Sequence, residues 1–429
     1  MKRFLIPGLL ASLMSTLSYT NAHSGNLVPL CEGFSPDKIK VDDGAPNGAK
    51  RISGIFNGKW ANQLEHTLVV ERISADGSVK AFYAWGQYAP WGADKAACVQ
   101  APGIYQDGVL TVRLSQDRSS KYALSPSGIL AGEYYFRDNL TIGTFQEVDL
   151  QKSPPNFTAP APEKLTFPSG YESELVATDL MEDGKPVRLQ LVTLKPEGPG
   201  PFPLLVFNHG STGRGDVPAA AGAVHLPNPI AQHFLEKGWM IVSPQRRGRG
   251  WSEGLYDEGF VKDRSRYSWV PHVTLAGFDR ALADIDAAVR VLLARDDVDA
   301  RQVIMGGQSR GGILSLAYSE RYPGRIRGVL NFVGGWLSTW HDTFATVHQT
   351  ILADAAKADT PTLWLYGRKD QLYGISDIRP FFDGFKEAGG VGEFVSFPNA
   401  GHGLMGETTL WKQPVDHFMQ ELGFPEFSR

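Results

Sequence analysis

The sequence predicts two domains: a small all-β domain of meander or barrel type, followed by a larger α/β domain whose mostly parallel sheet is covered by helices on both faces. Three observations predict this organisation: strand-like runs between turn signals early in the chain, a proline-rich segment after them, and apolar strands alternating with amphipathic helices beyond it. The 429 residues are 42% hydrophobic, which suffices for packed cores and excludes a disordered chain. Lysine and arginine number 42 against 46 acidic residues, and this balance argues against a nucleic acid partner.

Residues 1–22 have the pattern of a secretory signal peptide. Lys2 and Arg3 supply positive charge, a mostly apolar stretch runs to Leu17, and small residues precede the cleavage site expected after Ala22. A membrane anchor is the alternative, but the stretch is shorter than the roughly 20 residues that a span requires, and it contains a proline and a glycine. We therefore expect a secreted or periplasmic protein without stable membrane insertion once the signal peptide is removed.

The predicted all-β domain covers residues 23–152. Turn sequences at Asp76-Gly77, Asp107-Gly108 and Ser125–Gly128 separate runs rich in β-branched and aromatic residues, and Asp-Gly between such runs is a strong hairpin signal. About seven strands of a meander or small barrel are expected, among them 51–60, 67–73, 79–85 and 109–114. The aromatic residues of this region could line a ligand groove, but burial in a small β core is the commoner arrangement.

The sequence contains two cysteines, Cys31 and Cys98. In an oxidising compartment we expect them to form one disulfide, and the alternative is a pair of free buried thiols. Their number and spacing do not suggest a metal site, which would require three or four ligands.

Residues 153–168 are rich in proline and are expected to form a semi-rigid linker to the α/β domain at 169–429. In that domain, continuous apolar runs alternate with helical periodicity, which is typical of a parallel sheet covered on both faces. Strands are expected at 187–194, 203–207, 239–243, 302–305, 328–333, 362–366 and 393–397, and helices at 275–294 and 311–321. Ligands of such sheets bind at the carboxyl ends of the strands.

The nucleophile-elbow pattern Gly-x-Ser-x-Gly occurs twice, around Ser252 and around Ser309. An elbow requires a strand directly before the serine and a helix directly after it. Ser309 follows the apolar run 303–305 and precedes a predicted helix that opens with Gly311-Gly312, whereas Ser252 lies inside an arginine- and glycine-rich loop. Ser309 is therefore the predicted nucleophile, and Ser252 is predicted to be a loop serine.

A nucleophilic serine needs a general base and an acid that orients the base, and on this architecture they follow the serine in the order acid, then histidine. His402 is the predicted base, because it lies in the loop after strand 393–397. Asp370 is the predicted acid, because it lies just past strand 362–366, and Asp342 is its rival. The other downstream histidines and acids are expected in helical or solvent-facing positions: His341, His348, His417, Asp377 and Asp383.

Two N–H donors are expected to bind the oxyanion that develops on a substrate carbonyl. One is the backbone N–H of Arg310, which directly follows the nucleophile. The other is the N–H of Ser211 or Gly210, and the neighbouring side chains of Asn208 and His209 are expected to brace that loop.

The segments His209-Gly210-Ser211, Gly307–Gly311, Tyr366–Asp370 and Gly401-His402-Gly403 together resemble those of the α/β-hydrolase family, over about residues 165–429. The resemblance is nearest to the dienelactone-hydrolase-like and prolyl-oligopeptidase-like branches. It implies an eight-stranded, mostly parallel sheet, a Ser-Asp-His triad and no cofactor. A serine stands where true dienelactone hydrolases have a cysteine, and the amino-terminal β region is too short to be the propeller of prolyl oligopeptidases.

Five further residues are expected near a substrate: Arg246, Arg247, Trp251, Trp336 and Trp340. The arginines could pair with a substrate carboxylate, and the tryptophans could form an aromatic rim. The alternative for the arginines is structural pairing with a nearby acid: Asp257, Glu258 or Asp263.

The predicted function is that of an exported serine hydrolase that cleaves a carboxylic ester through an acyl-enzyme, without a metal or another cofactor. Its expected partner is a small-molecule ester or peptide. One alternative is a serine peptidase of prolyl-oligopeptidase type that acts on small peptides, because the same triad serves ester and amide bonds. A second alternative is a non-catalytic protein that binds a polymer. The sequence does not specify an oligomeric state.

Overall fold

The computed structural model describes residues 31–60, 64–89, 92–136, 139–148, 164–215, 228–353 and 355–428. The chain divides into two compact units, the first formed by residues 1–161 with 165–169 and the second by 162–164 with 170–429. The predicted signal peptide and residues 153–163 of the predicted linker lie outside the described residues.

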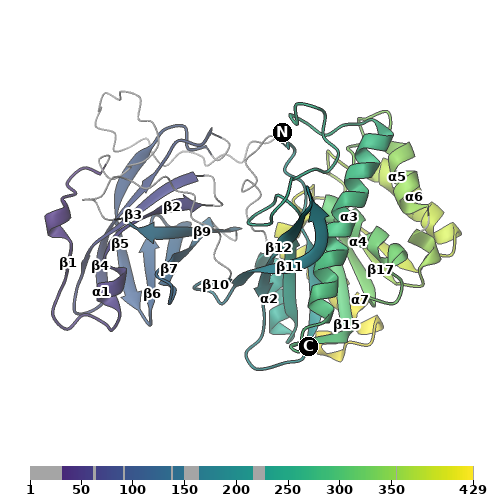
Figure 1. The fold of residues 1–429 in the computed structure, drawn as a ribbon. Coiled ribbons are helices and arrows are strands. Elements are labelled where there is room, and N and C mark those ends of the chain that lie inside the picture. Colours follow the sequence, from purple (N-terminus) through teal and green to yellow (C-terminus); the bar gives the residue numbers. More distant parts are fainter. Residues whose placement is uncertain are drawn as a thin grey trace. The chain divides into compact units, whose positions relative to one another are not determined.

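The first unit is a closed antiparallel barrel (Figure 1). Strands β2 to β9 pair consecutively, and β9 returns to β2 in a register that runs from Phe56↔Glu147 to Trp60↔Gly143. The short β1 adds to β3 in parallel. The strands are β1 (Lys40–Val41), β2 (Gly54–Trp60), β3 (Leu64–Ile73), β4 (Ser78–Trp85), β5 (Ala97–Gln106), β6 (Val109–Arg113), β7 (Arg118–Leu124), β8 (Leu130–Phe136) and β9 (Asn139–Glu147).

The predicted barrel-like domain is confirmed, with two differences in detail. Asp107 and Gly108 form the two-residue turn between β5 and β6 with φ of 51° and 81°, as the Asp-Gly signal predicted. The expected strand 51–60 begins only at Gly54, because α1 (Ala49–Ile52) occupies its start. The barrel also closes with eight strands, one more than expected.

Aromatic rings fill the interior of the barrel. The ring of Trp60 lies 4.8 Å from that of Phe145 and 5.8 Å from that of Tyr122, measured between centroids. The buried His66 joins this cluster through a 2.9 Å hydrogen bond between Nε2 and the Tyr122 hydroxyl. A Cβ on Gly132 would approach Phe145 to 2.6 Å, so only glycine fits at that position. These aromatic residues therefore form a packed core and do not line a groove.

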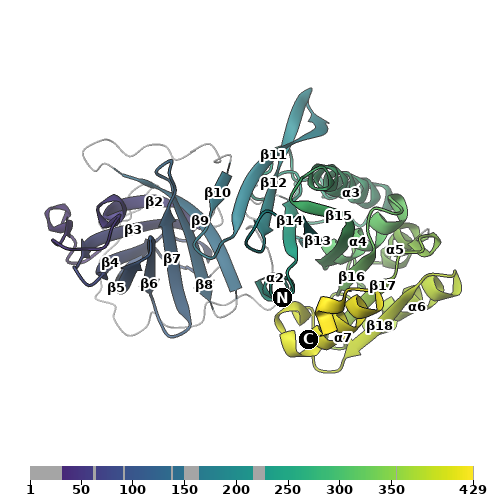
Figure 2. The same ribbon diagram turned by 90° about the horizontal axis from the view of Figure 1, so that it is seen from below.

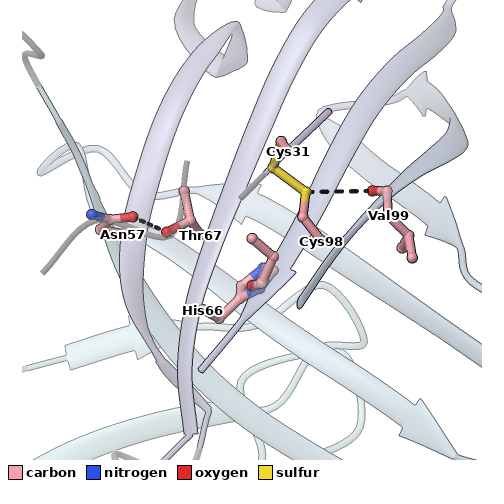
Figure 3. The surroundings of a disulfide bond; sticks show 7 residues. Cys31, Asn57, His66, Thr67, Cys98 and Val99 are labelled. Carbon is pink, nitrogen blue, oxygen red and sulfur yellow. Dashed lines mark hydrogen bonds between the residues drawn. A yellow bond between two sulfur atoms is a disulfide. The ribbon is translucent and has the colours of Figure 1, made fainter. Parts of the chain in front are cut away.

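A second apolar cluster covers the outer face of β3 and β4. Val69 and Phe82 alternate with interior neighbours and so point outward, where the segment that begins at Cys31 packs over them. Cys31 and Cys98 form a disulfide with a Cα–Cα distance of 5.1 Å, which attaches this segment to β5 (Figure 3).

Replacing both cysteines by alanine is expected to lower the free energy of unfolding of the barrel by about 2–4 kcal/mol, because the bond closes a long loop in the unfolded chain. The two cysteines are 67 residues apart. Urea denaturation of the double variant and of the oxidised wild type, followed by tryptophan fluorescence, measures the difference. An unchanged midpoint would show that the covering segment is held by packing alone.

The second unit is built on a sheet with the order β11-β12-β14-β13-β15-β16-β17-β18. Its strands are β11 (Glu172–Glu182), β12 (Lys185–Leu194), β13 (Phe202–Asn208), β14 (Met240–Gln245), β15 (Val298–Gln308), β16 (Gly328–Phe332), β17 (Thr362–Gly367) and β18 (Gly392–Phe397). The three-residue β10 (Lys164–Thr166) stands where the chain passes from one unit to the other. The strands from β14 to β18 in this order are parallel, whereas β11 and β12 form an antiparallel hairpin. This confirms the predicted mostly parallel sheet, and β11 is a strand that was not among those predicted.

Helices cover both faces of this sheet, as predicted. Figure 2 shows α2 and α7 on one face and α3, α4 and α5 on the other. The helices are α2 (Asn228–Glu236), α3 (Pro271–Leu293), α4 (Arg310–Arg321), α5 (Phe344–Leu352), α6 (Ile375–Glu387) and α7 (Thr408–Glu421). Among the described residues, no helix combines the length and apolar character that a membrane span requires.

Candidate active site

Ser309 occupies the sharp turn between β15 and α4. Its φ of 57° and ψ of −124° are strained for a residue with a side chain. Glycines make room for the turn: a Cβ on Gly307 would lie 2.3 Å from the backbone of Gly311, and one on Gly311 would lie 2.0 Å from the carbonyl oxygen of Asn208. The N–H of Ser309 donates to the carbonyl of Phe332 on the next strand at 2.9 Å. This is the strand–turn–helix geometry that the elbow pattern predicted.

The second Gly-x-Ser-x-Gly serine, Ser252, has a structural role. Its buried hydroxyl donates to the carbonyl of Gln245 at 2.6 Å and accepts the N–H of Gln190 at 2.8 Å. No helix follows it directly in this described part of the chain. The prediction of a loop serine is confirmed.

Asp370 and His402 form a hydrogen-bonded pair between two loops at the carboxyl end of the sheet. His402 Nδ1 lies 2.9 Å from Asp370 Oδ2. The other carboxylate oxygen accepts the backbone N–H groups of Leu372 and Tyr373 at 2.8 and 3.1 Å, so the carboxyl group is fixed on both sides. The rival Asp342 is exposed ahead of α5 and has no such partner among the described residues. The loops meet because Lys369 N–H donates to Ala400 O at 2.8 Å.

Two residues connect this pair to the elbow. Gln308, which precedes the nucleophile, donates from Nε2 to the carbonyl of His402 at 3.1 Å. Tyr373 lies with its ring 5.5 Å from that of His402, and its hydroxyl donates to Gly335 O at 2.7 Å. Burial raises the pKa of Tyr373, whereas the charge of Arg310 and a hydrogen bond with Ser309 act in the opposite direction. The structure thus pairs His402 with Asp370 and joins the loop of His402 to Gln308, the residue before Ser309.

The predicted oxyanion loop lies against the elbow. A Cβ on Gly210 would lie 3.4 Å from Ser309 Cβ and 3.3 Å from the carbonyl oxygen of Gln308. His209 braces the loop: Nδ1 donates to Gly210 O at 2.9 Å, and Nε2 accepts the N–H of Arg246 at 3.2 Å. Asn208 Nδ2 donates to the Ser315 hydroxyl on α4 at 2.9 Å. The expected bracing by these two side chains is confirmed.

A buried cluster of charges lies behind the elbow. Glu258 accepts from Arg246 Nε at 2.6 Å and from Arg310 Nη1 at 3.2 Å. The Arg310 guanidinium is also stacked between the rings of Tyr267 and Trp336, at 3.4 and 3.9 Å from their centroids. Burial alone would raise the pKa of Glu258, but the surrounding arginines hold it below its ordinary value, so this carboxylate is charged at neutral pH.

The substrate contacts expected of Arg246, Arg247 and Trp336 do not agree with their positions. Arg246 is buried against Glu258, one of the acids expected as a structural partner, and Arg247 pairs with Asp284 on α3 at 2.6 Å. Both guanidinium groups are therefore occupied inside the protein and not presented to a ligand.

The three tryptophans also differ in their surroundings. Trp336 is in the core, with its indole N–H donating to Thr274, so it is not part of a rim. Trp251 is half-buried, and its backbone N–H donates to Gln190. Trp340 is 61% exposed.

Sequence reasoning did not identify Glu258 as a partner of the elbow, nor Tyr373 and Gln308 as links to His402. Glu258 could have been inferred only as a partner for arginine. Its contact with Arg310 joins residues that are 52 positions apart, and no local sequence pattern predicts such a contact. Tyr373 follows the predicted acid by three residues, which is the one signal that could have drawn attention to it.

The other downstream histidines have structural positions. His348 on α5 is buried; its Nδ1 donates to Phe344 O at 2.9 Å, and its Nε2 accepts the N–H of Trp336 at 3.0 Å. His341 stacks on Trp269, and His417 is exposed on α7. This agrees with the expectation that none of them is the base.

The buried His348 is expected to make the free energy of unfolding of the protein fall as the pH is lowered. Burial lowers its pKa from 6.5 to about 4 in the folded protein. Because the unfolded state takes up a proton first, the contribution of neutral His348 is complete above pH 6.5 and is lost as the pH falls toward 4. Between pH 7 and pH 5, the free energy of unfolding of His348→Gln should therefore fall by about 2 kcal/mol less than that of the wild type. Urea denaturation at both pH values measures this, with the exposed His417→Gln as the control; equal pH dependence in both variants would contradict it.

Comparison with known proteins agrees with this architecture. Residues 203–355 match the family model described as the alpha/beta hydrolase fold. The chain is 29% identical over 109 residues to carboxylesterase SOBER1 of Arabidopsis thaliana, a match that covers 25% of this chain and 45% of that protein. It is 25% identical over 194 residues to the uncharacterised peptidase YuxL of Bacillus subtilis (strain 168), covering 40% and 28% respectively.

The chain therefore spans less than half of the length of these curated relatives. Among solved structures, an esterase of Pyrococcus furiosus aligns with a TM-score of 0.41 and 16% identity, over 58% of this chain and 90% of that one. The match at 203–355 spans β13 to α5 and includes the elbow at Ser309. Together with the order of the strands, it shows that the carboxy-terminal unit of this chain has the α/β-hydrolase fold.

Proposed function

We propose that this protein is a serine hydrolase that cleaves a carboxylic ester, with Ser309 as the nucleophile, His402 as the general base and Asp370 as the residue that orients the base. The observation that carries this proposal is the strained elbow at Ser309 together with the 2.9 Å contact between His402 Nδ1 and Asp370 Oδ2. With Nδ1–H donating to the carboxylate, Nε2 is the nitrogen that accepts the serine proton.

The reaction follows from these roles. Ser309 Oγ attacks the ester carbonyl, and His402 takes its proton and delivers it to the leaving alcohol. The Arg310 N–H and an N–H of the 210–211 loop bind the oxyanion of the tetrahedral intermediate. Water then attacks the acyl-enzyme by the same route and releases the carboxylic acid. The buried Asp370 stabilises the imidazolium that forms in each step.

Ester cleavage is the first choice of reaction because a relative that is 29% identical over 109 residues is a carboxylesterase. A second candidate is a serine peptidase that acts on small peptides, which is favoured by the similarity to a Bacillus subtilis peptidase over a longer stretch. Both reactions use the same triad, so the substrate pocket decides between them.

We further propose that the protein is exported to the periplasm or the medium. The charged start and apolar stretch of residues 1–22 support this. The disulfide between Cys31 and Cys98 also supports it, because such bonds persist in oxidising compartments. Amino-terminal sequencing of protein recovered from a periplasmic extract, with a start at His23, would support export; recovery of the uncut chain from the cytosol would contradict it.

The function is tested with the purified protein and a fluorophosphonate probe, followed by assays on short-chain and aryl esters beside aminoacyl and prolyl amides. We expect covalent labelling at Ser309 and faster turnover of esters. Faster turnover of amides would favour the peptidase. Absence of labelling and of turnover would overturn the proposal in favour of a non-catalytic binding protein.

A further inference from the structure

We propose that Arg246 and Arg249 are positioning residues that orient the Gly210–Ser211 peptide, and that Ser211 N–H is consequently the second oxyanion donor. This inference rests on the proposed function, and it chooses between the two donors that the sequence left open, Ser211 and Gly210.

Three donors converge on one carbonyl oxygen of the oxyanion loop. Gly210 O is 2.9 Å from His209 Nδ1, 3.2 Å from Arg249 Nη1 and 3.3 Å from Arg246 Nη2. Arg246 Nη1 also donates to the preceding carbonyl, that of His209, at 2.9 Å. Two guanidinium groups and an imidazole therefore fix the direction in which this carbonyl points.

The direction of the carbonyl determines the direction of the next N–H. In a planar trans peptide the C=O of residue 210 and the N–H of residue 211 point in opposite directions. With Gly210 O turned toward the arginines, Ser211 N–H is turned away from them. Among the described residues, Ser211 N–H has no backbone acceptor. Because Gly210 lies against Ser309, this N–H is available beside the nucleophile.

Arg246 is itself held by a carboxylate that also contacts the elbow. Glu258 bonds Arg246 through Oε1 and Arg310 through Oε2. Arg310 supplies the other expected oxyanion donor from its backbone. One buried carboxylate thus connects the residue that carries the first donor with the arginine that orients the second, and all of these side chains are buried.

This arrangement should favour the transition state over the bound ester. The guanidinium groups that donate to Gly210 O polarise this peptide, so Ser211 N–H becomes a stronger hydrogen-bond donor to an oxyanion. Because these charges are buried, solvent screens their effect only weakly. Loss of a complete oxyanion donor costs roughly 100- to 1,000-fold in kcat. Because a positioning residue acts through that donor, its loss should cost less, about 10- to 100-fold.

The test compares Arg249→Gln with the wild type in p-nitrophenyl acetate hydrolysis and in inhibition by an aryl trifluoromethyl ketone, which forms an oxyanion adduct with the active serine. We expect kcat to fall about 10- to 100-fold with KM nearly unchanged, and the inhibition constant of the ketone to rise by a similar factor. Arg249→Lys, which keeps the positive charge, should recover part of both effects.

Arg247→Gln is the matched control, because Arg247 is a buried arginine of the same loop that pairs with Asp284 and not with Gly210. It should lower stability while leaving the affinity of the folded protein for the ketone unchanged. Equal loss of ketone affinity in Arg247→Gln and Arg249→Gln, or a loss of stability alone in Arg249→Gln, would overturn the inference. If Arg249→Gln does not fold, Arg249→Lys decides by the same measurements.

Failure of this inference is distinguishable from failure of the proposed function. A wild type that neither reacts with the fluorophosphonate nor hydrolyses esters contradicts the proposed function itself. An active wild type with an Arg249 variant of unchanged kcat and ketone affinity contradicts only the role of the arginines.

Discussion

Replacing Ser309 by alanine is expected to lower kcat for ester hydrolysis by roughly ten-thousand-fold to a million-fold, because the proposed acyl-enzyme forms on its hydroxyl group. Alanine meets the same backbone strain at a φ of 57° as serine does, so the fold should be retained. The measurement is steady-state hydrolysis of an aryl ester, combined with mass spectrometry after fluorophosphonate treatment. The variant should bind no probe.

Ser252→Ala is the control for this experiment, since Ser252 stands in the other Gly-x-Ser-x-Gly sequence. Its hydroxyl bonds Gln190 and Gln245, so its removal should cost about 1–3 kcal/mol of stability. The folded variant should still be labelled and active at the wild-type rate. Labelling of Ser309→Ala together with loss of labelling in Ser252→Ala would move the nucleophile to the second motif.

Asp370→Asn is expected to lower kcat by about a thousand- to ten-thousand-fold. The amide oxygen of asparagine can keep the bonds from Leu372 and Tyr373 N–H, which places its NH₂ group opposite His402 Nδ1. The imidazole then accepts at Nδ1 and carries its proton on Nε2, where it cannot take the proton of serine. Steady-state kinetics together with thermal unfolding separates this effect from misfolding.

The matched control is Asp342→Asn, the substitution of the exposed rival acid. It should leave kcat within about twofold of the wild type, since surface substitutions away from a site have small effects. Full activity in Asp370→Asn, or a large loss in Asp342→Asn, would reject the assignment of Asp370.

The elbow shows how much of the site a local pattern can predict. The strand before Ser309 and the helix after it are encoded by adjacent residues, and the flanking glycines are required by contacts of 2.0 to 2.3 Å that any side chain would violate. The pairing of His402 with Asp370 was also predicted, because both follow strands whose carboxyl ends lie at the same edge of a parallel sheet. The hairpin at Asp107-Gly108 is likewise predictable from a local pattern, since two adjacent residues determine its turn.

The arginine-rich loop shows where such prediction ends. The sequence displays the charges of Arg246 and Arg247 but not their burial, so it favoured a structural ion pair only slightly over a substrate contact. Arg247 finds its acid 37 residues further on, in α3, and Glu258 reaches Arg310 across 52 residues. Trp336 was likewise expected at a rim and is instead in the core, with its indole N–H bonded to Thr274 on α3.

The amino-acid sequence by itself predicted most of the strands, the helices before and after the elbow strand, the two-domain organisation, and the serine, histidine and aspartate proposed for catalysis. These depend on turn propensity, apolar periodicity and chain order, all of which act between residues close in sequence or along one sheet edge. Only the tertiary structure decided that β9 closes the barrel on β2, and that the arginines face Gly210 and Glu258 instead of solvent. The physical reason is that burial and pairing of charges depend on which distant segments meet, and no local preference of the chain encodes that meeting.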